Sequence, residues 1–208
     1  MFVSRDDIEN MDQRYRIAFI NSLSGFKSAN LIGTVNSEGK TNLSIISSCV
    51  HIGAHPPLIG FVSRPNSVAR HTIENILATG HYTINHVNQA IFKQAHQTSA
   101  RYPQEHSEFE ATGLNELWVN DFSAPYVEQA VIKLGIVFRQ KYHLDINNTD
   151  FMVGEIMQVD LPGQCVAESG AVSVEAAGSL TVSGLDRYHT TELISKLSYA
   201  KPGTAVQE

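Results

Sequence analysis

The stretch GTVNSEGKTNLSIISS, Gly33 to Ser48, carries the Gly-Lys-Thr letters that end a phosphate-binding P-loop, and it also carries the pattern of a β-hairpin. Five residues lie between Gly33 and Gly39, one more than the P-loop motif G-x-x-x-x-G-K allows. The run after Lys40 is rich in β-branched and small residues, which favour a strand, whereas a P-loop opens a helix. The sequence therefore predicts two strands joined by a turn at NSEGK, with Gly39 at a position of positive φ, and argues against a nucleotide triphosphatase.

Strand-like segments dominate the rest of the chain, and helices are inserted between them. Strands are predicted at about 28–36, 41–52, 57–63, 81–87, 130–144 and 150–161, with a bend at residues 55–57 and irregular chain over 103–129. Helices are predicted at about 6–24, 66–79, 88–102 and 190–198. The helices do not alternate with strands as strand–helix–strand units, and the chain has no G-x-G-x-x-G motif. The predicted fold class is therefore mainly β, a β-barrel with inserted helices, in a single domain over residues 1–208 with a C-terminal tail from about 165 to 208.

The composition limits the classes of function. The chain has 208 residues, 42% of them hydrophobic, and a net charge of −6, which argues against a general nucleic-acid binder. It has no apolar run long enough to cross a membrane, and its charged N-terminus lacks a signal-peptide core, so a cytoplasmic protein is expected. His51 and His55 lie four apart on a strand-like segment, where their side chains do not converge as they would on a helix, so no metal site is expected.

Between residues 42 and 72 the sequence contains several short hydroxyl side chains, an amide and two guanidinium groups. They belong to Asn42, Ser47, Ser63, Arg64, Arg70 and Thr72. Such groups hold a phosphomonoester, because Arg offers a planar fork of donors and Ser and Thr add neutral ones. Composition alone favours the simpler interpretation of a hairpin with polar outer faces and solvated arginines.

The order of several short motifs changes that balance. They are Asn42-Leu43 with Ser47, Pro56-Pro57, Arg70-His71-Thr72, Asn75-Ile76 and GHYTIN at Gly80 to Asn85. Farther along, HSEFEATGL (106–114) and APYVEQAVIKLGI (124–136) follow. In this order, and over roughly residues 28–160, the chain resembles the flavin reductase-like family, which has the FMN-binding split-barrel fold.

The resemblance implies an FMN site. It places Asn42, Ser47 and Ser48 along the ribityl chain and ring, with Cys49 beside them, and it makes Ser63, Arg64, Arg70 and Thr72 the phosphate clamp. His71 is a further candidate, either as an aid to phosphate binding or as a solvated or helix-capping residue. Tyr188 and His189, in GLDRYHT near the C-terminus, are candidates for a nicotinamide or ring pocket. The chain departs from the family pattern where Ile45 replaces a Pro, Ser48 and Cys49 replace two Phe, and His71 replaces the Asp of K-D-T.

The resemblance also implies an activity. The expected function is a homodimeric NAD(P)H-dependent flavin oxidoreductase, in which NADH or NADPH gives a hydride to flavin N5 and the electrons pass to free flavin, oxygen or a partner oxygenase. The sequence singles out no catalytic side chain. Two alternatives remain: an FMN-binding electron carrier or redox sensor without nicotinamide turnover, and a barrel that binds no flavin.

Overall fold

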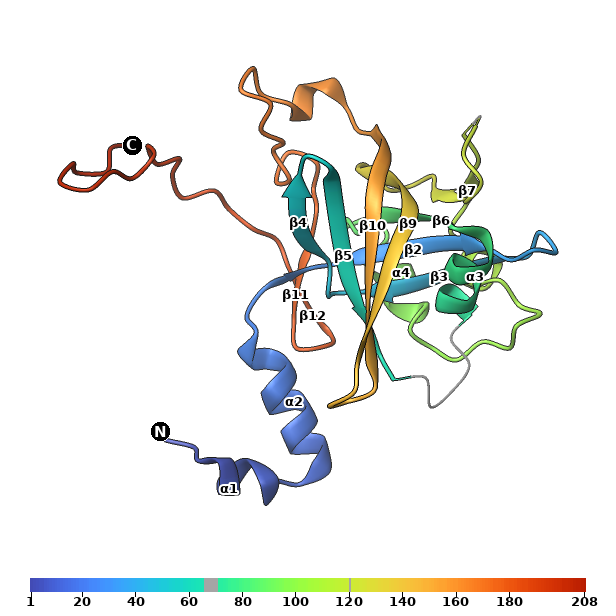
Figure 1. The fold of residues 1–208 in the computed structure, drawn as a ribbon, viewed down its shortest axis with the longest axis horizontal. Coiled ribbons are helices and arrows are strands. Elements are labelled where there is room, and N and C mark those ends of the chain that lie inside the picture. Colours follow the sequence, from blue (N-terminus) through green and yellow to red (C-terminus); the bar gives the residue numbers. More distant parts are fainter. Residues whose placement is uncertain (66–70, 120) are drawn as a thin grey trace.

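A computed structural model describes residues 1–65, 71–119 and 121–208 of the chain, and its centre is one curled β-sheet (Figure 1). The order of the seven strands across this sheet is β3-β2-β6-β9-β10-β5-β4. Their bounds are β2 Asn30–Val35, β3 Thr41–Ile46, β4 Val50–Ala54, β5 Pro57–Ser63, β6 His81–His86, β9 Lys133–Leu144 and β10 Thr149–Asp160. The prediction of a mainly β fold is confirmed.

The hairpin predicted at NSEGK is present and joins β2 to β3. Asn36 N donates to Lys40 O over 2.9 Å, and Gly39 has φ +84°, a conformation that favours glycine. The two strands pair from Asn30 opposite Ile46 to Val35 opposite Thr41. The residues of the turn therefore set the register in which β2 pairs with β3.

The predicted strand over 41–52 is instead two strands, and this correction defines the shape of the sheet. β3 ends at Ile46 and β4 begins at Val50, with a bend at residues 47–49 between them. These two strands are the opposite edges of the seven-stranded sheet although only three residues link them. Because three residues span about 10 Å at most, the sheet curls until its edges approach each other at residues 47–49. These residues are called the seam below.

Two hydrophobic clusters pack against opposite faces of β2. Ile32 enters a cluster with Phe61, Tyr82 and Met152, which α3 (His71–Thr79) covers through its Ile73 and Ile76. Leu31, its neighbour, enters a second cluster under α4 (Phe92–Gln97) and α5 (Glu108–Thr112). Successive side chains of a strand point to opposite faces, which explains the division. The helices thus hold β3 and β2 from both sides.

Three helix predictions need correction. The helix expected at 6–24 is two helices, α1 (Arg5–Glu9) and α2 (Gln13–Leu23), because the Asp12 side chain caps a new helix by accepting from Arg14 N and Tyr15 N. The helix expected at 88–102 is only α4. Residues 190–198, all within the described part, form no helix; their apolar side chains contact no core that would stabilise so short a helix.

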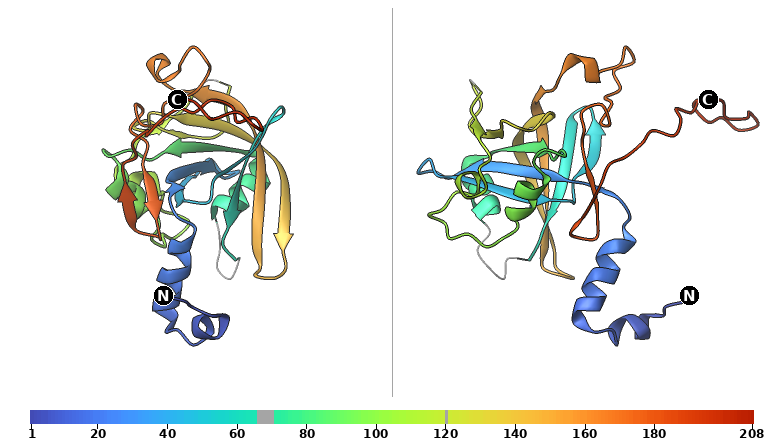
Figure 2. Two further views of the ribbon diagram at one scale, coloured as in Figure 1. Left: turned by 90° about the vertical axis from the view of Figure 1, so that its left-hand side faces the viewer. Right: turned by 180° about the vertical axis from the view of Figure 1, so that it is seen from behind.

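The two ends of the chain extend away from the barrel (Figures 1 and 2). The small sheet β1-β11-β12, built from Lys27–Ser28, Thr181–Ser183 and Arg187–His189, lies where both ends leave the barrel. The remaining elements are the pair β7 (Glu116–Leu117) and β8 (Tyr126–Val127) and the 3-10 helix η1 (Gly163–Cys165). Among the described residues, no helix is long and apolar enough to cross a membrane.

Candidate functional site

At the free edge of β3, side chains of neighbouring elements accept hydrogen bonds from the backbone N–H groups of the strand. β3 pairs with β2 on one side, so the N–H groups of Leu43 and Ile45 face away from the sheet. Leu43 N donates to Glu108 Oε2 over 2.9 Å, and Ile45 N donates to Thr98 Oγ1 over 3.0 Å. Among the described residues, none accepts a hydrogen bond from the N–H groups of residues 47–49, so a ligand on this edge finds its backbone donors at the seam.

The seam carries three of the predicted site residues, all partly exposed: Ser47, Ser48 and Cys49. Ser48 reaches across to β5, the strand next to the edge strand β4, where its Oγ donates to Val62 O over 3.0 Å and accepts from Val62 N over 3.1 Å. Ser48 thus fixes the bend against β5.

Cys49 lies at the same seam with its thiol turned toward the core. It packs against the cluster of Ile32, Phe61 and Tyr82, and burial raises its pKa to about 12. At neutral pH this thiol is protonated, which indicates a packing role and not a nucleophile. Tyr82, in the same cluster, also has a raised pKa, first through burial and then through the neighbouring Cys49.

Asn42, at the start of β3, is buried in a chain of polar contacts. Its Nδ2 donates to Glu108 Oε2 over 2.5 Å, and its Oδ1 accepts from Thr72 Oγ1 over 2.7 Å. Asn42 therefore joins α5 to α3, and its amide is already occupied on both sides. A shallow polar groove beside it is lined by Lys40, Asn42, His71, Asn75 and His106, among other residues.

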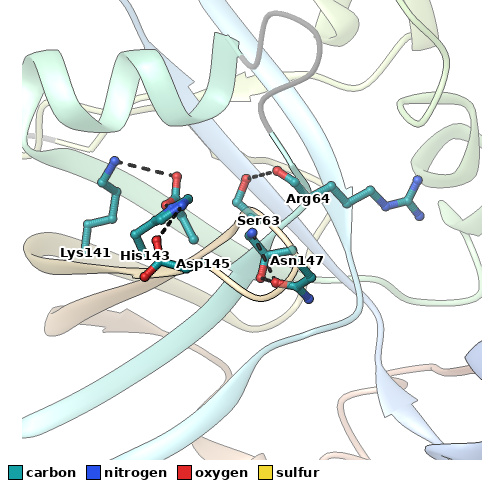
Figure 3. Close-up of polar contacts among 8 residues, drawn as sticks. Ser63, Arg64, Lys141, His143, Asp145 and Asn147 are labelled. Carbon is teal, nitrogen blue, oxygen red and sulfur yellow. Dashed lines mark hydrogen bonds and ion pairs between the residues drawn. The ribbon is translucent and has the colours of Figure 1, made fainter.

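The other predicted clamp residues lie where β5 ends. Ser63 is buried and its Oγ donates to Arg64 O over 3.2 Å, while the Arg64 guanidinium is exposed and extends away from Ser63 (Figure 3). Arg70 lies outside the described residues. His71 and Thr72 open the described part of α3, which packs on β2 and β3. The structure thus ties Thr72 to Asn42 and leaves Arg64 as an exposed cation.

Asp150 lies one strand over from Ser63, directly opposite it in the β10–β5 pairing. His143 Nδ1 donates to Asp150 Oδ1 over 2.8 Å, and Lys141 Nζ lies 3.6 Å from Asp150 Oδ2 (Figure 3). The hydrogen bond from His143 holds the pKa of Asp150 below its ordinary value, with the charges of Lys141 and His143 acting the same way and burial opposing them. The negative charge of Asp150 is therefore balanced by His143 and Lys141, next to the predicted clamp residue Ser63.

Tyr188 and His189 sit on β12, beside α4. Tyr188 OH and His96 Nδ1 lie 3.1 Å apart, and the Tyr188 ring packs against Phe92 with centroids 5.6 Å apart. His189 Nε2 is 2.8 Å from Ser183 Oγ. The pKa of Tyr188 is raised, mainly by burial and then by the charge of Asp186. Both side chains have partners within their own subunit, and their assignment to a nicotinamide or ring pocket stays a prediction.

Sequence reasoning did not find the residues that hold this site together. Glu108 and Thr98 are buried, at 6% and 4% exposure, and each accepts a backbone N–H of β3. Glu108 stands inside the motif HSEFEATGL, but its spacing from Asn42, 66 residues, gives no local signal. Among the described residues no group of three His, Cys, Asp or Glu could hold a metal ion.

Comparison with known proteins gives a consistent result. Residues 23–172 match the family described as "Flavin reductase like domain". The chain is also similar to a solved structure from Shewanella frigidimarina, described as a flavin reductase with a split barrel domain, at 50% identity and TM-score 0.93, covering 96% of this chain and 100% of that one. The expected split-barrel fold is thereby confirmed.

Two more distant solved structures share the fold. Nitrilotriacetate monooxygenase component B from Bacillus cereus is 17% identical with a TM-score of 0.82, covering 95% of this chain and 98% of that one. The 2-nitrobenzoate 2-nitroreductase of Pseudomonas fluorescens is 18% identical with a TM-score of 0.81, covering 99% and 98%.

Proposed function

The chain belongs to the flavin reductase-like family and is an oxidoreductase; from that premise we propose that it binds FMN at the seam and oxidises NADH or NADPH. Membership implies the use of a flavin and a reduced nicotinamide. The observation that supports the seam as the site is the pattern of free donors: side chains cap the edge of β3 as far as Ile45, and the chain then bends at residues 47–49.

The residues present fit the group. A flavin ring is an apolar slab with polar atoms on its rim, and the seam offers backbone N–H groups for that rim. Ser48, fixed against Val62, keeps the bend in place. The exposed guanidinium of Arg64 and the predicted ligand Arg70 would hold the phosphate. When bound, the flavin supplies the redox chemistry, and the protein binds and orients it.

Spectroscopy and turnover test this function directly. Purified protein mixed with FMN should show bound-flavin absorbance and quenched fluorescence, and it should then oxidise NADH or NADPH in the presence of free flavin or oxygen. Protein that leaves FMN fluorescence unchanged would contradict the flavin proposal. Protein that binds FMN without oxidising either nucleotide would favour an electron carrier or redox sensor.

The phosphate clamp makes a prediction that separates FMN from riboflavin. A partly buried bond between charged groups is worth roughly 1.5–3 kcal/mol, and each 1.4 kcal/mol is about tenfold in affinity. Arg70→Ala should therefore weaken FMN binding by about ten- to a hundredfold. Riboflavin lacks the phosphate and should bind as before. Equal weakening of both flavins in a fluorescence titration would show that Arg70 is not the phosphate ligand.

We also propose a homodimer in the cytoplasm, with a partner oxygenase as one electron acceptor. Support for the dimer comes from α2, whose described residues include none that is buried, while Ile17 and Ile20 on one side are exposed. An apolar helix face without a partner marks an interaction site. Support for a partner oxygenase is the shared fold with a protein that is itself a monooxygenase component.

A further inference from the structure

Three hydrogen bonds run in one direction between α5 and α3 through the start of β3. Glu108 Oε2 accepts from Leu43 N and from Asn42 Nδ2, and Asn42 Oδ1 accepts from Thr72 Oγ1. Asn42 is 8% exposed and Glu108 is 6% exposed, so water does not compete freely for these groups. The series Glu108–Asn42–Thr72 is called the relay below.

The chemistry of each group fixes the direction of the relay. A backbone N–H can only donate, so Leu43 makes Glu108 Oε2 an acceptor, and a carboxylate has no proton to return. Asn42 must therefore turn its NH₂ toward Glu108 and its carbonyl oxygen toward Thr72. That oxygen can only accept, so the single hydroxyl proton of Thr72 is committed to Asn42. What Thr72 Oγ1 still offers is lone pairs, and the residue is half-buried, with part of its surface open.

We propose that Glu108 is a positioning residue which, through Asn42, presents Thr72 Oγ1 to the flavin as a hydrogen-bond acceptor for a ribityl hydroxyl. This proposal rests on the proposed function, since it concerns the same site. A phosphomonoester carries about −1.5 to −2 charges at pH 7 and is almost entirely an acceptor. It cannot donate to Thr72, whereas ribityl hydroxyls can. The relay thus assigns Thr72 to the ribityl hydroxyls of the ligand, whereas the sequence resemblance assigns it to the phosphate clamp.

A second carboxylate that contacts β3, Glu116 of β7, provides a matched control. Glu116 Oε1 accepts from Thr41 Oγ1 over 2.5 Å, and Glu116 Oε2 accepts from Trp118 Nε1 over 2.9 Å. Glu116 therefore also holds the first residue of β3, one position before Asn42, but it is outside the relay. Glu116→Ala and Glu108→Ala remove the same acceptor group from two contacts with the same strand.

The experiment measures the affinities of three flavins by fluorescence and competition. Lumiflavin has the ring alone, riboflavin adds the ribityl chain, and FMN adds the phosphate. Thr72→Val should weaken riboflavin and FMN by the same factor, about two- to tenfold for one neutral hydrogen bond, and leave lumiflavin unchanged. Thr72→Ser keeps the hydroxyl and should restore binding.

Glu108→Ala tests the positioning step. Alanine removes the acceptor that fixes the Asn42 amide, so Asn42 is free to reverse and the proton at Thr72 is no longer directed away from the ligand. Riboflavin and FMN should weaken together, by roughly the same two- to tenfold, while lumiflavin and the Glu116→Ala variant stay at the wild-type value. In a Thr72→Val background, Glu108→Ala should add nothing, because the two act through one contact.

Each other result overturns a defined part of the proposal. Weakening of FMN alone would assign Thr72 to the phosphate. Equal weakening of all three flavins, or an effect of Glu108→Ala that persists without the Thr72 hydroxyl, would make Glu108 a residue of the fold only. Wild-type protein that binds no flavin would instead refute the proposed function, and the relay's role in the site with it.

Discussion

The barrel and the two chain ends differ in how they bury apolar side chains. In the barrel, Ile32 and Ile84 are 0% and 1% exposed. In the N-terminal arm, defined here as residues 1–24, Ile17 and Ile20 are 45% and 43% exposed, and in the C-terminal segment Ile194 is 99% exposed. The same residue type thus has opposite surroundings within one chain.

This difference teaches where the stability of each region comes from. Burying an Ile side chain is worth about 1.5–3 kcal/mol, and the barrel gains this from its own residues. The arm extends away from the barrel (Figure 2) and gains little of it within one subunit. We infer that the barrel folds on its own, whereas the arm is completed by a second copy of the chain. The predictions below test this contrast.

The largest effect is expected from one substitution made in both regions. Ile84→Ala leaves a cavity in the barrel and should lower the free energy of unfolding by about 3 kcal/mol. Ile20→Ala, on the exposed face of α2, should change that of the monomer by less than about 0.5 kcal/mol. Urea unfolding at a concentration where the protein is monomeric gives both values. Similar losses at the two positions would show that the arm packs within its own subunit.

The next effect concerns association. If α2 contacts a second copy, Ile17→Ser with Ile20→Ser should weaken the dimer by at least about tenfold, because the two side chains together would lose more than 1.4 kcal/mol of burial. Light scattering over a dilution series measures this. Ala18→Ser, an exposed position on another side of the same helix, is the control and should leave association unchanged. A wild-type chain that stays monomeric at every concentration would refute the dimer itself.

Sequence reasoning succeeded where a few neighbouring residues decide the structure. The turn at Gly39 and the long strands β9 and β10 follow from local patterns. It failed where distant segments meet: Glu108 with Asn42 are 66 residues apart, and Thr98 with Ile45 are 53 apart. It also placed a short helix at 190–198, where the local sequence cannot tell whether a surface exists to receive the apolar side chains.

The far end of the β9–β10 hairpin offers a third situation. Like the N-terminal arm, it reaches beyond the main body of the barrel (Figure 2). Unlike the arm, it is stabilised by contacts within its own subunit, those of His143 and Lys141 with Asp150. Asp150 is 3% exposed, whereas the side chain of Asp145, in the turn, is 99% exposed and its Oδ1 lies 3.6 Å from His143 Nε2. Two carboxylates therefore face one imidazole from a buried and an exposed position.

The smallest predicted effect, and the one that depends on pH, follows from this pair. The pKa of Asp150 is lowered in the folded protein, so its contribution to stability is present above the unfolded value of about 3.9 and is lost as pH falls through the folded value. Asp150→Asn should cost about 1 kcal/mol at pH 7, a modest figure because Lys141 and His143 are partly exposed. The gap from wild type should close below about pH 4. Asp145→Asn should cost a few tenths of a kcal/mol at most at any pH, since exposed ion pairs contribute little. Urea midpoints at pH 7, 5 and 3 for the three proteins measure both differences. A loss for Asp145→Asn equal to that for Asp150→Asn, or a gap for Asp150→Asn that widens in acid, would show that the hairpin is held by something other than this buried carboxylate.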